Sequence, residues 1–251
     1  MNIAIVTYEL LHLITNKYWQ EFVMLNVLSP YLQSIYFSHY TPDDESGLVC
    51  FGGALTINCL IDAYSHGIFP WPICNPDNNK TVLAWFSPKL RAIFEYERFH
   101  IPRSLERLYR SNQFQIKFDT DFEGVIRGCS SAQDRKNRTW ITPQMIRAYI
   151  RMYDYGYAHS VEAWAEGKLA GGVYGVALGG LFAAESMFYV KPNASKIALV
   201  ALIDHLKENG YSLIDIQEIT PNTLRFGAIE ISREIYKQRL HDALKLIHIK
   251  W

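Results

Sequence analysis

The sequence lacks the cysteine patterns that mark metal sites and disulfide-rich proteins. Its four cysteines, Cys50, Cys59, Cys74 and Cys129, form no CxxC pair, and their spacing matches no zinc motif. Disulfides are rare in the cytosol, so four scattered thiols are typical of a reduced compartment. We therefore expect a cytoplasmic protein that holds no metal. Thiol catalysis would need a base paired with a cysteine, and the sequence indicates none.

Long uncharged hydrophobic runs are also missing. No segment reaches the 18 or so apolar residues that a membrane span needs. Residues 1–33 are apolar-rich, but Glu9, Lys17 and Glu21 interrupt them, and no signal-peptide cleavage pattern follows. We interpret this segment as an N-terminal extension of unassigned role. It is either helical or the product of an upstream start, with Met24 as the working start.

The chain has no excess charge of either sign, since 25 Lys and Arg balance 25 Asp and Glu. A globally basic nucleic-acid-binding protein is thereby excluded. The charge is nevertheless uneven, because residues 89–154 hold 13 Lys and Arg against 8 Asp and Glu, a net of +5. Such a region could meet phosphates, but charge alone favours a solvated surface.

The 251 residues are 49% hydrophobic and 20% charged, as in a globular protein with a sizeable core. We divide them into the extension, a small N-terminal domain (34–112) and a C-terminal domain (113–251). Helical spacing and caps predict helices over 56–66, 104–109, 121–129, 142–155, 195–209 and 232–246. Alternation and turns predict strands over 82–86, 90–94, 114–118, 159–165, 169–178, 181–189 and 213–217.

From residue 114 the expected order is β-α-α-β-β-β-α-β-α. This order predicts an α+β fold with a mixed sheet, like that of the N-acetyltransferase superfamily, preceded by a smaller α+β domain. A fold does not define a function, so the site has to be argued from side chains.

Glu185 is the most informative of these side chains, because it is an acid within an apolar strand. A buried carboxylate is costly unless it is paired or used. In the expected sheet it would lie near Asp215 and Gln217, which stand two apart on the next strand and so share a face. Ile214 and Ile216 would face the core. The group is either a polar network that pins the sheet or a functional site.

Three further positions could bind a ligand. Trp71 lies between two prolines and Trp140 follows basic residues, so both suit stacking on a nucleobase, although core packing is commoner for tryptophan. Ser195 lies where a helix begins, and the N–H groups of a helix start can hold an anion. An ordinary N-cap formed by Asn193 or Ser195 is the alternative.

Read together, these segments resemble the leucyl/phenylalanyl-tRNA–protein transferase family. The resemblance covers roughly residues 50–240, and its segments occur in family order. They are Gly67-Ile68-Phe69-Pro70-Trp71, Trp85-Phe86-Ser87-Pro88, Thr139-Trp140-Ile141, His159-Ser160-Val161-Glu162, residues 171–176, Glu185-Ser186-Met187-Phe188, Asn193-Ala194-Ser195-Lys196, Asp215-Ile216-Gln217 and Gly227-Ala228.

The resemblance implies an acyltransferase that moves Leu or Phe from aminoacyl-tRNA to the N-terminal Arg or Lys of a protein and so marks it for the N-degron pathway. It implies no cofactor and no metal, because the ester is already activated. By the same resemblance, Trp71 and Trp140 stack around the terminal adenosine, Met187 helps to hold the aminoacyl side chain, and Ser195 adds to substrate binding.

The resemblance also assigns the chemistry. Glu185 would orient the substrate or the attacking amine, and Asp215 would polarise Gln217, which hydrogen-bonds the amine. The proton acceptor stays open, with the ribose hydroxyl of the tRNA as one candidate. The partners would be Leu-tRNA or Phe-tRNA and acceptor proteins, with no membrane, and the enzyme would be a monomer.

The chain departs from the family pattern near the pocket. Ala184 replaces a usual glycine, Trp85-Phe86 replaces a Trp-Trp pair, and Glu218 replaces an apolar residue. A related transferase with another aminoacyl donor is therefore one alternative. The other is an acyl-CoA-dependent N-acetyltransferase, although its glycine-rich pyrophosphate turn is missing at residues 191–196. A non-catalytic RNA- or peptide-binding protein would not need Glu185, Asp215 and Gln217.

Overall fold

The computed structural model describes residues 34–43, 46–74, 81–111, 113–132 and 139–251. The interpretation of residues 1–33, as a helical extension or as the product of an upstream start, lies outside the described residues. Every element below belongs to the compact unit formed by residues 34–251.

A seven-stranded mixed sheet organises this unit, with strand order β12-β6-β11-β10-β9-β8-β7. The central strands β10 and β11 are parallel, and the other neighbours are antiparallel. This confirms the expected mixed sheet and the pairing of the hairpin strand with the strand that follows the helix. The bounds are β6 Leu90–Phe94, β7 Gln115–Phe118, β8 Ala158–Ala165, β9 Lys168–Leu178, β10 Leu181–Tyr189, β11 Leu213–Gln217 and β12 Ile229–Ser232.

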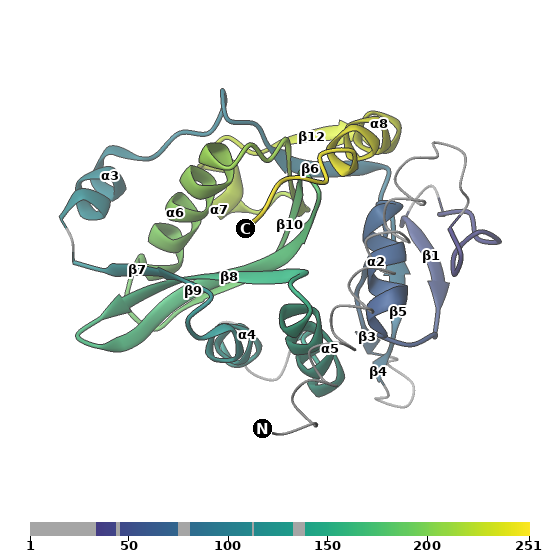
Figure 1. Ribbon diagram of the computed structural model, residues 1–251, viewed down its shortest axis with the longest axis horizontal. Helices are drawn as coiled ribbons and strands as arrows, with labels where there is room; N and C mark the ends of the chain where they lie inside the picture. Colours follow the sequence, from purple (N-terminus) through teal and green to yellow (C-terminus); the bar gives the residue numbers. More distant parts are fainter. Residues whose placement is uncertain (1–33, 44–45, 75–80, 112, 133–138) are drawn as a thin grey trace, which may run out of the picture. The chain divides into compact units, whose positions relative to one another are not determined.

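Helices cover both faces of this sheet (Figure 1). The crossover helix α6 (Ala194–Glu208) connects β10 to β11 on one face. The helices α4 (Phe122–Ser131) and α5 (Pro143–Asp154) cover the other face. Ten of the fifteen residues of α6 are buried, which explains why its sequence is apolar almost all round.

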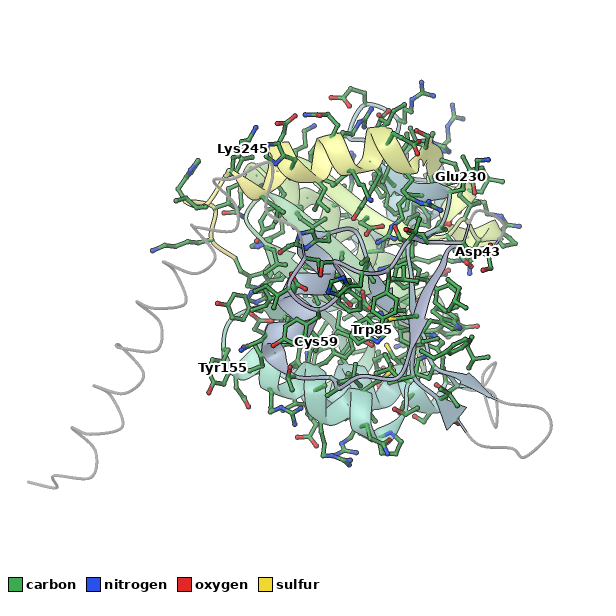
Figure 2. All side chains as sticks on the ribbon, turned by 90° about the vertical axis from the view of Figure 1, so that its right-hand side faces the viewer. Asp43, Cys59, Trp85, Tyr155, Glu230 and Lys245 are labelled. Atoms are coloured by element: carbon green, nitrogen blue, oxygen red, sulfur yellow. The ribbon has the colours of Figure 1, made fainter. Side chains whose placement is uncertain are left out.

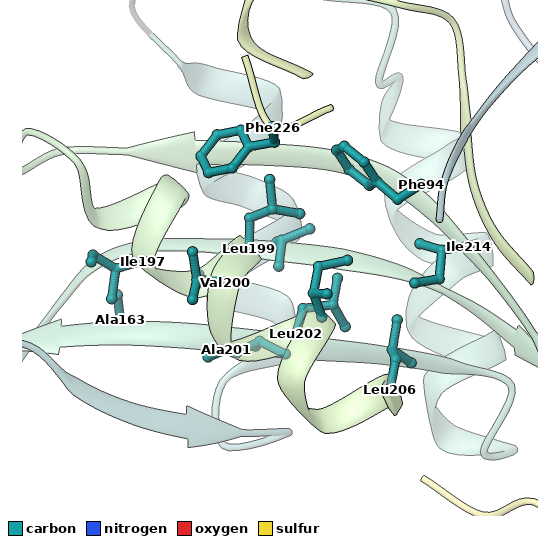
Figure 3. Packing of buried hydrophobic residues seen from close by; sticks show 14 of the residues in the cluster. Phe94, Ala163, Ile197, Leu199, Val200, Ala201, Leu202, Leu206, Ile214 and Phe226 are labelled. Atoms are coloured by element: carbon teal, nitrogen blue, oxygen red, sulfur yellow. The ribbon is translucent and has the colours of Figure 1, made fainter. Parts of the chain in front are cut away.

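A hydrophobic core lies between α6 and the sheet. Leu199, Leu202 and Leu206 of α6 pack towards Phe94 of β6 and Ile214 of β11, as Figure 3 shows. Ile216 packs against the same cluster, so both isoleucines of β11 face this core, as the alternation predicts.

The N-terminal elements form a smaller sheet of β1 (Leu48–Phe51), β5 (Ala84–Phe86) and β2 (Phe69–Pro70), with helix α2 (Ile57–Ser65) beside it. A short pair, β3 (Ile73–Cys74) and β4 (Thr81–Val82), adjoins it. Cys59 of α2 and Trp85 of β5 lie within this region in Figure 2. The Trp85 ring is 1% exposed, and its Nε1 donates to the Gly52 carbonyl. Trp85 is therefore a core residue.

Several short strands, among them β1, β3 and β12, were not predicted. The sequence around β1 reads as a loop because it is short and follows turn residues, whereas β12 includes the acid Glu230 and forms the edge of the large sheet. The strand β6 lies within residues 34–112 and yet belongs to the large sheet, beside β11. The large sheet therefore draws a strand from the segment that the sequence assigns to the small domain.

Hydroxyl side chains begin three of the main helices. The Oγ atoms of Thr56, Thr142 and Ser232 accept from the backbone of α2, α5 and α8 (Arg233–Leu244), respectively. Two short helices complete the elements, α3 (Arg103–Arg110) and α7 (Pro221–Leu224). None of the described helices is long and apolar enough to cross a membrane.

Candidate active site

The two central strands both become irregular at the same level of the sheet. Parallel pairing of β10 with β11 extends to Ala183 and Asp215. The register of β10 on β9 then shifts between Ala184 and Ser186, and the register of β11 on β6 shifts between Asp215 and Gln217. A bulge re-aims side chains, and bulges are common beside active sites. Gln217 itself takes a left-handed backbone, with φ of 57°.

These irregularities bring the side chains of Glu185 and Gln217 into contact. Gln217 Nε2 donates to Glu185 Oε1 at 3.0 Å, and the Tyr149 hydroxyl donates to Glu185 Oε2 at 3.0 Å. The Tyr64 hydroxyl lies 2.6 Å from that of Tyr149. Strands β10 and β11 and helices α5 and α2 thus each contribute one polar side chain to a single cluster.

Burial raises the pKa of Glu185 from 4.5 to about 7, and the nearby Asp215 carboxylate adds to the rise. The hydroxyls of Tyr64 and Tyr149 act in the opposite direction. Glu185 nevertheless keeps part of its surface exposed, whereas Tyr64 and Tyr149 are buried. Burial also raises the pKa of both tyrosines well above the ordinary value, so they stay protonated donors. Glu185 is therefore a half-buried residue whose carboxyl can change its protonation near neutral pH.

Asp215 has a different environment, because its carboxylate is fully buried and both of its oxygens accept hydrogen bonds from other residues. Arg91 Nε and Nη2 donate to its two oxygens at 2.8 and 2.6 Å. The Gln217 backbone N–H at 2.9 Å and the Tyr236 hydroxyl at 2.8 Å complete the set. Asp215 was expected to polarise the Gln217 side chain. It instead holds the Gln217 backbone, because the bulge turns the amide side chain towards Glu185.

Arg91 was missed by the sequence reasoning. It is 2% exposed, its Nη1 donates to the Gly67 carbonyl, and its guanidinium lies over the rings of Phe69 and Tyr236. Burial acts against its charge, but the adjacent Asp215 carboxylate outweighs burial and raises the pKa of Arg91 above its ordinary value. Its presence within the apolar strand Leu90–Phe94 was the available signal, by the same argument that singled out Glu185.

Trp71 and Trp140 lie together, although 69 positions apart in the sequence. Their rings stack on each other, with centroids 4.6 Å apart and planes 19° apart. Trp71 is 38% exposed and Trp140 is partly buried. A base between the two rings would require a separation of about 7 Å, twice a carbon–carbon contact distance. The exposed outer surface of the pair is the face open to a ligand without such a change.

Met187 and Ser195 lie apart from the polar cluster. Met187 packs against the core under α6 and lines a cavity of about 320 Å³ with residues of α4 and the end of β10. Ser195 is 4% exposed in the first turn of α6, where its backbone faces Gly171 of β9. Gly171 is four residues, about 13 Å, from Gly175, the partner of Ala184. The N-cap of α6 is Asn193, not Ser195, and it makes no side-chain cap bond.

The described residues contain no group of three or more His, Cys, Asp or Glu side chains that could hold a metal ion. The groups of the cluster itself are a carboxyl, an amide and two phenol hydroxyls.

Models of one family match most of the chain. The leucyl/phenylalanyl-tRNA protein transferase model matches residues 93–241, and the model of that family's N-terminal domain matches residues 53–89. The chain belongs to the leucyl/phenylalanyl-tRNA–protein transferase family. The matched segments contain both bulged strands and both tryptophans, and Arg91 lies between the two segments.

Curated relatives agree with this membership. The leucyl/phenylalanyl-tRNA–protein transferase of Magnetococcus marinus is 45% identical over 206 residues, which cover 80% of this chain and 85% of the relative. That of Paramagnetospirillum magneticum is 45% identical over 190 residues, covering 76% of this chain and 90% of the relative.

Solved structures are far more distant. The ribosomal-protein-alanine N-acetyltransferase of Brucella melitensis has a TM-score of 0.32 and 13% identity, and covers 45% of this chain and 86% of that one. The L-PGS of Bacillus licheniformis has a TM-score of 0.39 and 11% identity, with coverage of 76% and 70%.

Proposed function

We propose that the cluster around Glu185 transfers Leu or Phe from aminoacyl-tRNA to the α-amine of a protein that begins with Arg or Lys. Membership of the family makes the chain an aminoacyl-tRNA–protein transferase, an acyltransferase of the N-degron pathway. It also decides against the acyl-CoA-dependent alternative. The observation that carries the proposal is the contact of a partly exposed carboxyl, of pKa about 7, with the amide of Gln217.

The reaction joins the α-amine nitrogen to the ester carbonyl carbon and breaks the bond between that carbon and the ribose oxygen. The attacking ammonium must first lose a proton, since only the neutral amine has a free electron pair. Its ordinary pKa, about 7.7–8.0, lies close to that of Glu185, so proton transfer to this carboxylate is nearly balanced. After the attack the nitrogen loses a second proton. The ribose oxygen leaves with one of the two protons, delivered by the protonated Glu185 directly or through the neighbouring ribose hydroxyl, and the other proton passes to water.

Gln217 positions the reacting groups. One hydrogen of its Nε2 is used on Glu185, which leaves the second hydrogen and the amide oxygen for substrate. The oxygen can accept from the amine, and the hydrogen can donate to the developing oxyanion. An amide is a poor base, so the proton goes to Glu185 and not to Gln217.

Asp215 acts through Gln217. Its four hydrogen bonds leave no oxygen lone pair directed at substrate, and the carboxylate is 0% exposed. We assign it as a positioning residue that fixes the left-handed backbone of Gln217. Arg91 and Tyr236 in turn fix Asp215.

The exposed face of the Trp71–Trp140 pair would stack on the terminal adenine of the donor, a contact worth about 1–3 kcal/mol. The exposed guanidiniums of Arg103, Arg107 and Arg110 along α3 would bind phosphates of the tRNA stem. Met187 remains our candidate for the aminoacyl side chain, and Ser195 for a supporting contact at the start of α6. We propose that the enzyme works as a monomer in the cytoplasm without a cofactor.

A transfer assay tests this function. Purified protein is supplied with labelled Leu-tRNA or Phe-tRNA and an acceptor protein that begins with Arg or Lys. Label should appear at the acceptor N-terminus. An acceptor that begins with Ala or carries an acetylated α-amine should stay unlabelled. Absence of transfer from a panel of charged tRNAs would refute the proposal, and transfer to internal lysines would refute the α-amine specificity.

The aromatic pair has its own test. Trp140→Ala should weaken binding of the charged tRNA about tenfold or more, whereas Trp140→Phe should keep most of it, because a smaller aromatic face still stacks. Equal loss in both variants would argue that the indole is needed for packing and not for stacking.

A further inference from the structure

A cavity of about 480 Å³ adjoins the tryptophan pair. Residues 53–56, before helix α2, line one side, and Thr142, Gln144, Arg147 and Arg151 of α5 line the other. Pro72, the neighbour of Trp71, also lines it. Its volume is within the range of small-ligand sites, about 300–1,000 Å³.

The charge of this cavity is one-sided. The described residues of its lining include Arg147 and Arg151, and none of them is Asp or Glu. The two arginines stand one helical turn apart and so project from the same face of α5. Arg151 Nη2 donates to the Leu55 carbonyl, whereas Arg147 is exposed and makes no ion pair with another described residue. The guanidinium of Arg147 can therefore donate to a bound anion.

The remaining lining suits an anion with several oxygens. Thr56 and Thr142 are the N-caps of α2 and α5, so the positive ends of both helix dipoles lie at this cavity. Thr81 and Gln144 add neutral donors. Arginine binds phosphate oxygens in a bidentate manner, which a threonine or glutamine does not replace.

We propose that this cavity binds the phosphate groups of the single-stranded 3′ segment of the donor tRNA, immediately before its terminal adenosine. The inference rests on the proposed function, since it takes the adenine to stack on Trp71 and Trp140. Pro72 follows Trp71 and Thr142 lies two residues after Trp140, so a strand whose last base stacks on the pair has this cavity beside it, with Arg147 in its lining. The cavity then fixes the direction in which the strand enters the site.

The test compares two donors that differ in whether two cytidine nucleotides, with their phosphates, precede the adenosine. One is a leucyl ester of adenosine, and the other is a leucyl ester of the trinucleotide CCA. Arg147→Gln should lower kcat/KM about tenfold with the trinucleotide and leave it within about twofold with the nucleoside. Arg147→Lys should recover part of the loss. Arg127→Gln, which removes an exposed arginine of α4 paired with Glu123, is the matched control and should affect neither donor.

Binding of uncharged CCA, followed by titration calorimetry, separates the cavity from the transfer reaction. Arg147→Gln should weaken it and reduce the salt dependence of log K by about 0.7 per lost phosphate contact. If the wild type transfers from neither donor but Arg147→Gln still weakens CCA binding, the proposed function fails and the cavity assignment stands.

Two results would overturn the inference itself. An equal loss of kcat/KM with both donors would give Arg147 a structural role. A loss that appears only with acceptors bearing acidic residues after the N-terminus would show that the cavity binds the acceptor protein instead.

Discussion

At the scale of the residue, Glu185 combines an apolar setting with access to solvent. Burial raises its pKa to about 7, and yet it keeps an exposed edge and two hydrogen-bond donors, Gln217 and Tyr149. Asp215, only one strand away, is paired with Arg91 and is fully buried. The two carboxylates are therefore suited to different tasks, proton exchange for Glu185 and positioning for Asp215.

Replacing Glu185 by Gln should lower the activity and, above the pKa of Glu185, raise the stability relative to the wild type. Because the folded pKa is raised, folding favours the protonated acid, and the wild type loses stability as the pH rises from about 4.5 through 7. Glutamine stays neutral at every pH. The difference in unfolding free energy between Glu185→Gln and the wild type should therefore shift by about 2–3 kcal/mol in favour of the variant when the pH rises from 4.5 to 8. Urea titrations at both pH values measure this gain.

The pH–rate profile of the same variant tests the proton acceptor. In the wild type, kcat/KM should rise through an apparent pKa near 7, and Glu185→Gln should lose this limb together with most of the activity. A variant that kept both the rate and the limb would show that another group takes the proton.

Removing Asp215 and removing Gln217 should have different consequences. Asp215→Ala leaves the buried Arg91 charge unpaired, so we expect a loss of about 3–5 kcal/mol of unfolding free energy as well as of activity. Gln217→Ala leaves the ion pair intact and should lose activity with at most about 1–2 kcal/mol of stability. Denaturant curves beside transfer rates separate the two. Similar destabilisation by both would refute the positioning role of Asp215.

At the scale of the element, the bulges of β10 and β11 depend on their neighbours. Gly175 of β9 pairs with Ala184, immediately before the β10 bulge. A Cβ on Gly175 would overlap the Ala183 carbonyl oxygen and lie within 2.7 Å of two atoms of the Phe182 ring. β10 can therefore approach β9 this closely only because residue 175 has no side chain.

Gly175→Ala should cost about 1–3 kcal/mol of unfolding free energy and lower kcat beyond the loss of folded protein, since it pushes β10 and Glu185 away. Gly156→Ala is the comparison. Its Cβ would meet nothing within 4 Å, so only its positive φ, 74°, adds strain of about 1–2 kcal/mol. It should lower stability without changing kcat. Equal effects on kcat would contradict the displacement of β10.

At the scale of the whole described unit, distant parts of the chain complete the large sheet and its core. β6 (90–94) begins just after the match to the N-terminal domain model and ends within the match to the other model. It lies beside β11 in the sheet and places Arg91 next to Asp215. The last residue, Trp251, stacks on His159 of β8, with centroids 4.5 Å apart, and on Phe182 of β10 at 5.4 Å. Residues from both halves of the sequence therefore support the strand that bears Glu185.

Trp251→Ala should lower the unfolding free energy by about 2–4 kcal/mol, because it removes both ring contacts from a partly buried position. Trp251→Phe should retain about half of this. The midpoint of thermal unfolding provides the measurement, and an unchanged midpoint in Trp251→Ala would show that the chain end adds nothing to the fold.

The periodic elements, the mixed sheet and the family were predictable from the order of residues. Helical spacing and hydroxyl caps located α2, α4, α5 and α8 to within a few residues, because capping and amphipathicity are local properties. The sequence also singled out Glu185, since an acid in an apolar strand is costly wherever the strand lies.

The contacts of each polar residue, in contrast, depend on how the strands and helices pack together. Whether Asp215 bonds a backbone or a side chain depends on a one-residue bulge, and bulges arise from pairing with β6 and not from local sequence. Arg91, Tyr64, Tyr149 and Tyr236 joined the cluster through contacts between elements far apart in the chain. Long-range pairing of this kind has no local period, so the spacing of residues does not reveal it.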